Sequence, residues 1–276
     1  MASTGNQAKV ILHWLNSSRA QRILWLMTEL KVPYEIKVYH RDKTAFAPPE
    51  LAKIHPLGKS PVITVIPPQS STGAKAEPIV LAESGFISEY ICEHWGRNSP
   101  LVPKKWRDGQ EGAVGGETAA WLRYQYLMYY AEGSLMPFLV FFLVTSTDLK
   151  SPQVPFFVRP ITGAIANKIN SVFIMPNVRK NLELLELYLK TPPEEGDGTG
   201  YLCGNRLTAA DIMLSYPLFA VRERAADFTI DGQSIEAKFP ATFSYLERLE
   251  QEPGYVQSVK DIEAIDGKFK LLPDSA

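Results

Sequence analysis

The chain has few cysteines. Cys92 and Cys203 are the two among 276 residues, and they lie far apart in the sequence. This count gives no support to a disulfide framework or to a thiolate metal site, and it excludes a dithiol reaction of the Cys-x-x-Cys type. We therefore interpret both cysteines as small buried hydrophobic residues, and the sequence predicts no metal site.

Net charge and long apolar runs are also scarce. The formal charge is −1 and the isoelectric point is near 6.5, so no long-range field favours nucleic acid as a partner. The most apolar stretch, Leu135 to Val144, spans ten residues and contains Pro137, whereas a membrane-spanning helix needs about 20 residues. We interpret it as a core helix. Met1 to Lys9 is polar and shows no signal peptide. We expect a cytoplasmic protein, and peripheral membrane association stays open.

The length of 276 residues and the hydrophobic content of 45% suit two domains. In residues 1–96, alternating apolar strands and periodic helices predict the order βαβ, helix, ββα, which is a layer of helices on a mixed sheet. Residues 97–116 are rich in proline and glycine and read as a linker. Residues 117–276 carry helical patterns and predict an all-helical domain.

A capping motif marks one helix start in the second domain. Thr208-Ala209-Ala210-Asp211 has the spacing of a capping box, in which the carboxylate three residues along reaches back to the first N–H group. A buried helix start needs such a cap, which is worth about 1 kcal/mol. We therefore interpret Asp211 as a structural residue rather than as part of a site.

Two motifs in the first domain predict a binding site. Gly58-Lys59-Ser60-Pro61 is a turn before an apolar strand, where a proline suits the strand start and can follow a cis bond. Glu83-Ser84 opens a helix, whose first N–H groups and dipole bind carboxylates. Together the motifs can hold an extended peptide-like ligand, with backbone pairing at Ser60 and carboxylate capture at Ser84.

These residues resemble the cytosolic glutathione S-transferase family. The family pattern Asn-Pro-x-Gly-Lys-Val-Pro corresponds to His55–Pro61, and Glu-Ser-x-Ala-Ile corresponds to Glu83–Ile87. The runs His13–Arg22 and Ala47–Leu51 are similar to a microbial branch found in fungi and bacteria. The resemblance implies an α/β thioredoxin-like N-terminal domain (βαβ-α-ββα) followed by an all-α C-terminal domain, which forms the pocket for an electrophile. It also implies a homodimer.

The same resemblance implies that glutathione is the co-substrate and assigns four residues to it. The γ-glutamyl carboxylate would bind at Ser84, and the cysteine backbone of glutathione would pair with Ser60. Lys59 would lie near the glycyl carboxylate. Glu83 would accept from the γ-glutamyl amine, directly or across a dimer. The resemblance implies no metal.

Catalysis needs a donor that stabilises the glutathione thiolate. A free thiol with a pKa of about 8.5 is only a few per cent ionised at pH 7, and a hydrogen-bond donor at a helix start lowers that pKa. In serine-type relatives the catalytic serine occupies the place that Leu15 or Asn16 holds here. We expect Ser18 to be the donor, with Ser17 as the second candidate and Asn16 as the third. Both serines also suit a plain helix cap.

The sequence therefore predicts an enzyme that conjugates glutathione to small hydrophobic electrophiles in detoxification, or reduces organic peroxides with the same thiolate. The alternative is a glutathione-binding protein without catalysis, in a regulatory or scaffold role. Glutathione-dependent disulfide exchange is disfavoured, because relatives with that activity have a cysteine where this chain has Ser17-Ser18.

Overall fold

The computed structural model describes residues 8–42, 45–68, 77–146, 149, 154–227 and 229–273. The chain forms two compact units. Unit 1 combines residues 1–102 with Leu249–Asp274, and unit 2 is Pro103–Arg248. The end of the chain thus returns to the unit in which the chain begins.

Unit 1 is built on a mixed sheet of four strands in the order β2-β1-β3-β4. The central strand β1 (Lys9–Leu15) pairs in parallel with β2 (Tyr34–Tyr39) and antiparallel with β3 (Val62–Ile66). Strand β4 (Ile79–Ala82) adds an antiparallel edge beside β3. A parallel pair needs a crossover connection, and the helix between β1 and β2 supplies it.

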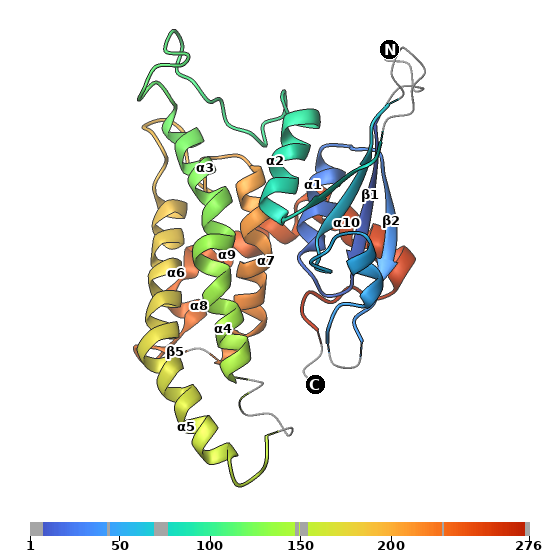
Figure 1. Ribbon diagram of the computed structural model, residues 1–276. Helices are drawn as coiled ribbons and strands as arrows, with labels where there is room; N and C mark the ends of the chain where they lie inside the picture. Colours follow the sequence, from blue (N-terminus) through green and yellow to red (C-terminus); the bar gives the residue numbers. More distant parts are fainter. Residues whose placement is uncertain are drawn as a thin grey trace. The chain divides into compact units, whose positions relative to one another are not determined.

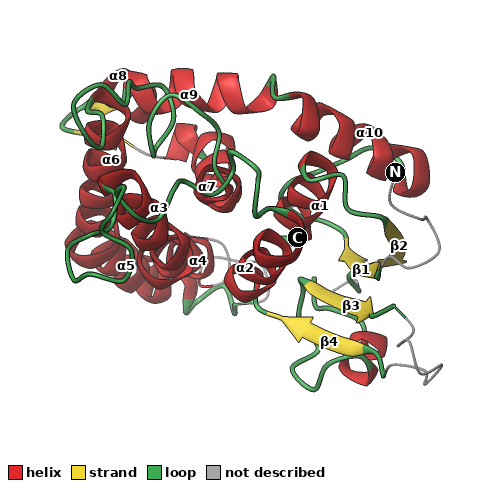
Figure 2. Cartoon of the chain, turned by 90° about the horizontal axis from the view of Figure 1, so that it is seen from above, coloured by secondary structure: helices red, strands yellow, loops and turns green. Residues whose placement is uncertain are grey.

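Helices α1 (Ala20–Glu29) and α2 (Ser84–Trp95) pack against each other and cover one face of this sheet (Figure 2). The apolar positions that predicted α1, among them Ile23, Leu24 and Met27, are fully buried. A short 3-10 helix, η1 (Pro49–Lys53), stands where a helix was predicted after the second strand. The predicted order βαβ, helix, ββα is therefore confirmed.

The last helix of the chain, α10 (Pro253–Asp266), completes unit 1 by packing along α1 (Figure 2). Gln21 donates from Nε2 to Ser258 Oγ at 3.2 Å. The Tyr34 hydroxyl donates to Asp261 Oδ2 at 2.8 Å. These bonds join residues more than 200 positions apart, so the C-terminal segment is part of the framework that holds the first helix.

Unit 2 consists of helices and one short hairpin (Figure 1). Its elements are α3 (Ala119–Tyr130), η2 (Ala131–Leu135), α4 (Met136–Ser146), α5 (Arg159–Ile169), η4 (Asn170–Ile174), α6 (Met175–Lys190), α7 (Ala209–Glu223), η5 (Ala225–Asp227), β5 (Thr229–Ile230), β6 (Gln233–Ser234), α8 (Ile235–Lys238) and the larger part of α9 (Pro240–Glu250). Because η2 and η4 are π-helical turns, they join their neighbours into two long helical runs. The first run, Ala119–Ser146, is apolar and long enough to cross a membrane by length and composition alone.

Helix α7 is the core of unit 2, since every residue from Ala209 to Val221 is buried. It begins with the predicted capping box. The Asp211 Oδ2 atom accepts from the N–H and the hydroxyl of Thr208 at 2.7 and 2.6 Å. Its Oδ1 atom accepts from the Leu202 N–H at 2.9 Å and from the Tyr245 hydroxyl at 2.7 Å. The predicted structural role of Asp211 is confirmed.

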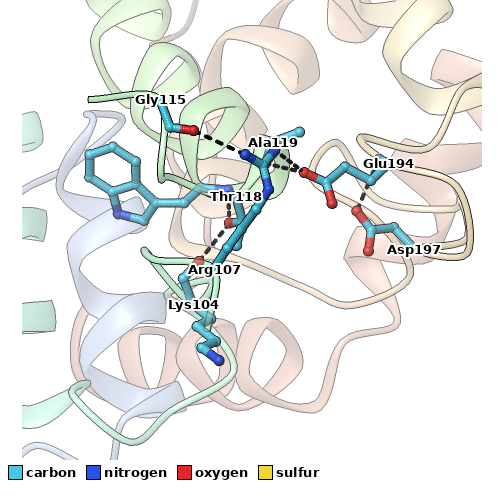
Figure 3. A network of polar contacts seen from close by, with 8 residues as sticks. Lys104, Arg107, Gly115, Thr118, Ala119, Glu194 and Asp197 are labelled. Carbon is cyan, nitrogen blue, oxygen red and sulfur yellow. Dashed lines mark hydrogen bonds and ion pairs between the residues drawn. The ribbon is translucent and has the colours of Figure 1, made fainter. Parts of the chain in front are cut away.

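A polar network ties the segment before α3 to the rest of unit 2 (Figure 3). Arg107 donates to the Gly115 carbonyl at 3.0 Å and to Glu194 Oε1 at 2.9 Å. The same Glu194 oxygen accepts from the Ala119 N–H at 2.9 Å. The bond from Ala119 and the bond from Arg107 lower the pKa of the Glu194 carboxyl. A carboxylate at a helix N-terminus is favourable, so this contact fixes where α3 begins.

The buried imidazole of His13 makes the stability of unit 1 dependent on pH. Its Nδ1 atom lies 3.1 Å from the Tyr39 hydroxyl, and its Nε2 atom lies 2.9 Å from Thr64 Oγ1. Burial, with a smaller contribution from Lys37, lowers the pKa of His13 below its usual 6.5. As the pH falls below 6.5, the unfolded chain takes up this proton before the folded chain does, so stability is lost.

Between pH 7.5 and pH 5.5, urea unfolding is expected to show a larger loss of stability in the wild type than in His13→Gln. Glutamine keeps polar atoms near Tyr39 and Thr64 but does not titrate. The folded and unfolded states of the variant therefore bind the same number of protons at this position. An equal loss in both proteins would assign the pH dependence to another group.

Candidate functional site

Unit 1 contains a small open pocket. It lies where the start of α1, the turn before β3 and the start of α2 come together. Its lining residues are Arg19, His55, Leu57, Lys59, Ser60, Pro61, Ala82, Glu83 and Ser84. The structure therefore brings all four predicted glutathione-binding residues to one place, although the two motifs are separated in the sequence.

The turn before β3 holds its shape through its backbone. Gly58 has a φ of +57°, in the left-handed region that favours glycine, and its N–H donates to the His55 carbonyl at 2.8 Å. The Ser60–Pro61 peptide bond is cis. This turn places Lys59 and Ser60 on the pocket wall, immediately before Val62 enters the sheet.

The start of α2 forms the opposite side of the pocket. Glu83 precedes the helix with a φ of +71°, a conformation that costs on the order of 1–3 kcal/mol in a residue other than glycine and is frequent at functional sites. Its side chain is exposed. In the described part of the chain no side chain caps this helix. The first N–H groups of α2 are thus suited to an anion.

Ser84 is the first residue of α2 and is buried at 2% exposure. Its Oγ atom accepts from Nη2 of Arg22, at 3.1 Å. Arg22 comes from α1 and is fully buried. Because the guanidinium can only donate, it takes an acceptor position of Ser84 and leaves the Ser84 hydroxyl proton to point elsewhere. Arg22 thereby orients a predicted binding residue without lining the pocket.

The predicted catalytic serines lie in the loop before α1. Ser18 is 5% exposed, and its hydroxyl donates to the Leu15 carbonyl at 2.6 Å. The same oxygen accepts from the Ala20 N–H at 3.2 Å and lies 3.1 Å from Ser60 Oγ. A serine has one hydroxyl proton, so Ser18 can donate to a thiolate only by releasing Leu15. The contact with Ser60 places this loop beside the pocket.

Ser17 and Asn16 complete this loop, and Arg41 holds them. Ser17 is buried at 6% exposure and has a φ of +47°. Arg41 donates to the carbonyls of Asn16 and Ser17 through its guanidinium, at 3.2 Å each, and its N–H donates to Asn16 Oδ1 at 2.8 Å. Asn16 Nδ2 has no hydrogen-bond partner among the residues that the structure describes. Asn16, Ser17 and Ser18 are not among the residues that line the pocket.

Two pocket residues, Arg19 and His55, were not predicted. Arg19 immediately follows the candidate serines, and His55 opens the motif that contains Lys59. Both lie within the runs that carried the resemblance, and Arg19 also stands next to the candidate residue Ser18. Arg19 and Lys59 give the pocket two cationic groups, and Glu83 gives it one carboxylate.

Comparisons with known proteins agree on one family. Residues 16–94 match the family described as glutathione S-transferase, N-terminal domain, and residues 165–248 match glutathione S-transferase, C-terminal domain. Glutathione S-transferase 1 of Saccharomyces cerevisiae is 32% identical over 258 residues, which cover 94% of this chain and 97% of that protein. Glutathione S-transferase 3 of Schizosaccharomyces pombe is 32% identical over 77% of this chain and 74% of its own length.

Solved structures agree on the fold. A glutathione S-transferase from Actinobacillus pleuropneumoniae has a TM-score of 0.62 at 25% identity, with 95% of each chain covered. A glutathione transferase from Phanerochaete chrysosporium, solved with oxidised glutathione, has a TM-score of 0.60 at 17% identity over 96% of this chain and 98% of its own. The predicted fold class, a thioredoxin-like domain joined to an all-helical domain, is confirmed. The chain belongs to the glutathione S-transferase family, in agreement with the predicted fungal and bacterial type.

Proposed function

We propose that this glutathione S-transferase binds glutathione in the pocket of unit 1 and transfers it to small hydrophobic electrophiles. The observation that carries the proposal is the match of charges. Glutathione has two carboxylates and one ammonium group, and the pocket offers Lys59 for one carboxylate, Ser84 at the start of α2 for the other, and Glu83 for the ammonium group. Opposite charges placed in this way fix the orientation of a ligand as well as its affinity.

The γ-glutamyl carboxylate binds at Ser84 and the first N–H groups of α2, and its ammonium group faces Glu83. The cysteine backbone of glutathione pairs with Ser60. The glycyl carboxylate lies toward Lys59. A Phanerochaete chrysosporium transferase of the same fold was solved with 1-(S-glutathionyl)-2,4-dinitrobenzene, which supports a conjugating reaction on an aromatic electrophile. Peroxide reduction would use the same thiolate.

Among the three predicted thiolate donors, the structure favours Asn16 on hydrogen-bonding grounds. Its amide N–H groups have no hydrogen-bond partner within the described residues, whereas the Ser18 proton is engaged with the Leu15 carbonyl. A hydrogen bond to a charged group contributes about 1.5–3 kcal/mol, which corresponds to roughly 1–2 units of thiol pKa. Ser18 remains the alternative donor and Ser17 the next, and either would have to turn its hydroxyl toward the sulfur.

Ultraviolet difference titration of the bound glutathione thiolate tests both the function and the donor. In the wild type we expect a thiol pKa below about 8.5. Asn16→Ala is expected to raise it by about 1–2 units with a smaller effect on glutathione affinity, and Ser18→Ala is expected to leave it depressed. The reverse pattern would make Ser18 the donor. A normal thiol pKa in the wild type, with glutathione bound, would favour the non-catalytic role.

We further propose that the enzyme is a cytoplasmic homodimer that acts in detoxification. This rests on membership of the glutathione S-transferase family. Sedimentation velocity of the full chain measures the oligomeric state directly. A monomer at micromolar concentration would contradict the dimer and would leave Glu83 to act within its own chain.

A further inference from the structure

Unit 2 exposes many large apolar side chains along α4, α5 and η4. Eleven of the twenty-three exposed large apolar residues in the described part of the chain lie between Val140 and Phe173. Phe156 and Phe157 are 79% and 68% exposed. We call the exposed apolar side chains of residues 140–173 the apolar face. Helix α4 was predicted to be a core helix, and that prediction is wrong for the four residues of α4 that belong to this face.

The apolar face follows one side of a regular helix. Ile161, Ile165, Ile169 and Val172 are spaced by four, four and three residues, so they share a side of the helical run Arg159–Ile174. All four are exposed. At 1.5 Å per residue this run is roughly 24 Å long. In Figure 1, α5 and the C-terminal end of α4 lie together at the end of unit 2 away from the start of α3.

Polar as well as apolar side chains lie between α4 and the run that begins with α5, where the rings of Phe138 and Phe173 also meet with their centroids 5.7 Å apart. The Thr145 hydroxyl is buried and donates to Asn170 Oδ1 at 2.6 Å. Asn170 Nδ2 donates to Ser146 Oγ at 3.2 Å. A helix pair that faces water buries its apolar stripe and exposes its polar side chains. Here polar side chains are buried while large apolar ones nearby are exposed, which suits surroundings that are themselves apolar.

The charges around the apolar face are mostly positive, since Asp148 is the one acidic residue in the sequence from 140 to 182. Residues 149–182 contain no aspartate or glutamate, and they contain five basic residues, which are Lys150, Arg159, Lys168, Arg179 and Lys180. Arg179 is paired with Glu183 and Asp231. Lys168 and Lys180 are exposed, and neither has an ion pair within the described residues. Apolar side chains accompanied mainly by lysine and arginine are typical of helices that lie in a membrane interface.

We propose that the apolar face docks on the surface of an anionic phospholipid membrane, with α5 lying in the plane of the interface. Anionic headgroups supply the negative charge that residues 149–182 lack. A second copy of the chain supplies it poorly, because a two-fold contact brings the same surface of both copies together and therefore opposes lysine with lysine. An anionic membrane accounts for both the exposed apolar side chains and the excess of positive charge.

Flotation of the full chain with lipid vesicles tests this surface. We expect binding to phosphatidylcholine vesicles that contain about 30% phosphatidylserine, and much weaker binding to pure phosphatidylcholine. Ile161→Glu/Ile165→Glu is expected to lower the bound fraction roughly tenfold or more, since it places two charges in the interface. Lys168→Gln/Lys180→Gln is expected to remove most of the preference for phosphatidylserine. Val114→Glu is the matched control, because Val114 is fully exposed in unit 2 outside the face.

The proposal fails if the wild type does not float with vesicles, or if the Ile161/Ile165 variant floats as well as Val114→Glu. Sedimentation velocity of the same variants tests the alternative that a second copy of the chain covers the apolar face. A loss of dimer in the Ile161/Ile165 variant, without vesicle binding by the wild type, would assign the face to a contact between copies. Binding is measured without glutathione, so the result is independent of the proposed transferase site. Glutathione binding by each variant confirms that it is folded.

Discussion

Replacing Asp211 with alanine is expected to lower the free energy of unfolding by at least about 3 kcal/mol. Asp211 is fully buried, and its carboxylate accepts four hydrogen bonds, two of them from the backbone N–H groups of Leu202 and Thr208. A buried donor that loses its partner costs about 1–3 kcal/mol. The two backbone groups cannot turn toward other acceptors, and the loss of the helix cap adds about 1 kcal/mol.

The protonation of Asp211 does not remove this expectation. Burial raises the pKa of the carboxyl, and the hydrogen bonds from Thr208, Leu202 and Tyr245 act in the opposite direction. In either protonation state the two oxygens face the same donors. The cost of the substitution therefore comes mainly from the donors that are left unpaired.

Urea unfolding of Asp211→Ala, Asp211→Asn and Tyr245→Phe separates the contributions. Asparagine is expected to cost nearly as much as alanine, because its NH2 group would face donors at one side of the site. Tyr245→Phe removes one hydroxyl that donates to Asp211 and is expected to cost only about 1 kcal/mol. If Asp211→Ala cost no more than Tyr245→Phe, the carboxylate would not be the junction of α7, α9 and the loop at Leu202.

The parts of the fold that the sequence predicted are those with local signals. The capping box at Thr208 and the periodic apolar residues of α1 are local patterns, and both formed the expected structure. The return of α10 to unit 1 was not predicted. Its contacts with α1 join residues that are far apart in the sequence, and no local sequence pattern indicates them. The π turns η2 and η4 also carry no clear signal in the sequence, although they join their neighbours into two long helical runs.

The candidate site shows the same division. Lys59, Ser60, Glu83 and Ser84 could be selected because each stands in a short motif, and they line one pocket. The direction of the Ser18 proton could not be predicted, because it depends on where the Leu15 carbonyl lies. The roles of Arg22 and Arg41 likewise depend on side chains reaching across the fold. Composition identified α4 as apolar, but it could not show which of its apolar residues are exposed.

Replacing the buried Arg22 with methionine is expected to weaken glutathione binding by about tenfold or more. Arg22 donates to Ser84 Oγ, and a hydrogen bond from a charged group is worth about 1.5–3 kcal/mol, where about 1.4 kcal/mol is tenfold in affinity. Without the guanidinium, the Ser84 hydroxyl is free to turn away from the ligand carboxylate. Isothermal titration calorimetry with glutathione measures the change.

Ser84→Ala and the double variant test whether the two residues act together. If Arg22 works through the Ser84 hydroxyl, the effects of the two substitutions on affinity are expected to be less than additive. Arg97→Met is the matched control, since Arg97 lies at the end of α2 and pairs with the exposed Glu93. Fully additive effects would mean that Arg22 influences the ligand by another route.

Stability distinguishes this positioning role of Arg22 from a merely structural one. Methionine is flexible and apolar and fills irregular space in a core, and it removes the desolvation cost that a buried guanidinium carries. We therefore expect Arg22→Met to unfold at a urea concentration equal to or above that of the wild type while it binds glutathione more weakly. Such a separation would mean that the buried guanidinium is retained for the site, at some cost to the fold. A parallel loss of stability and affinity would instead make Arg22 part of the core.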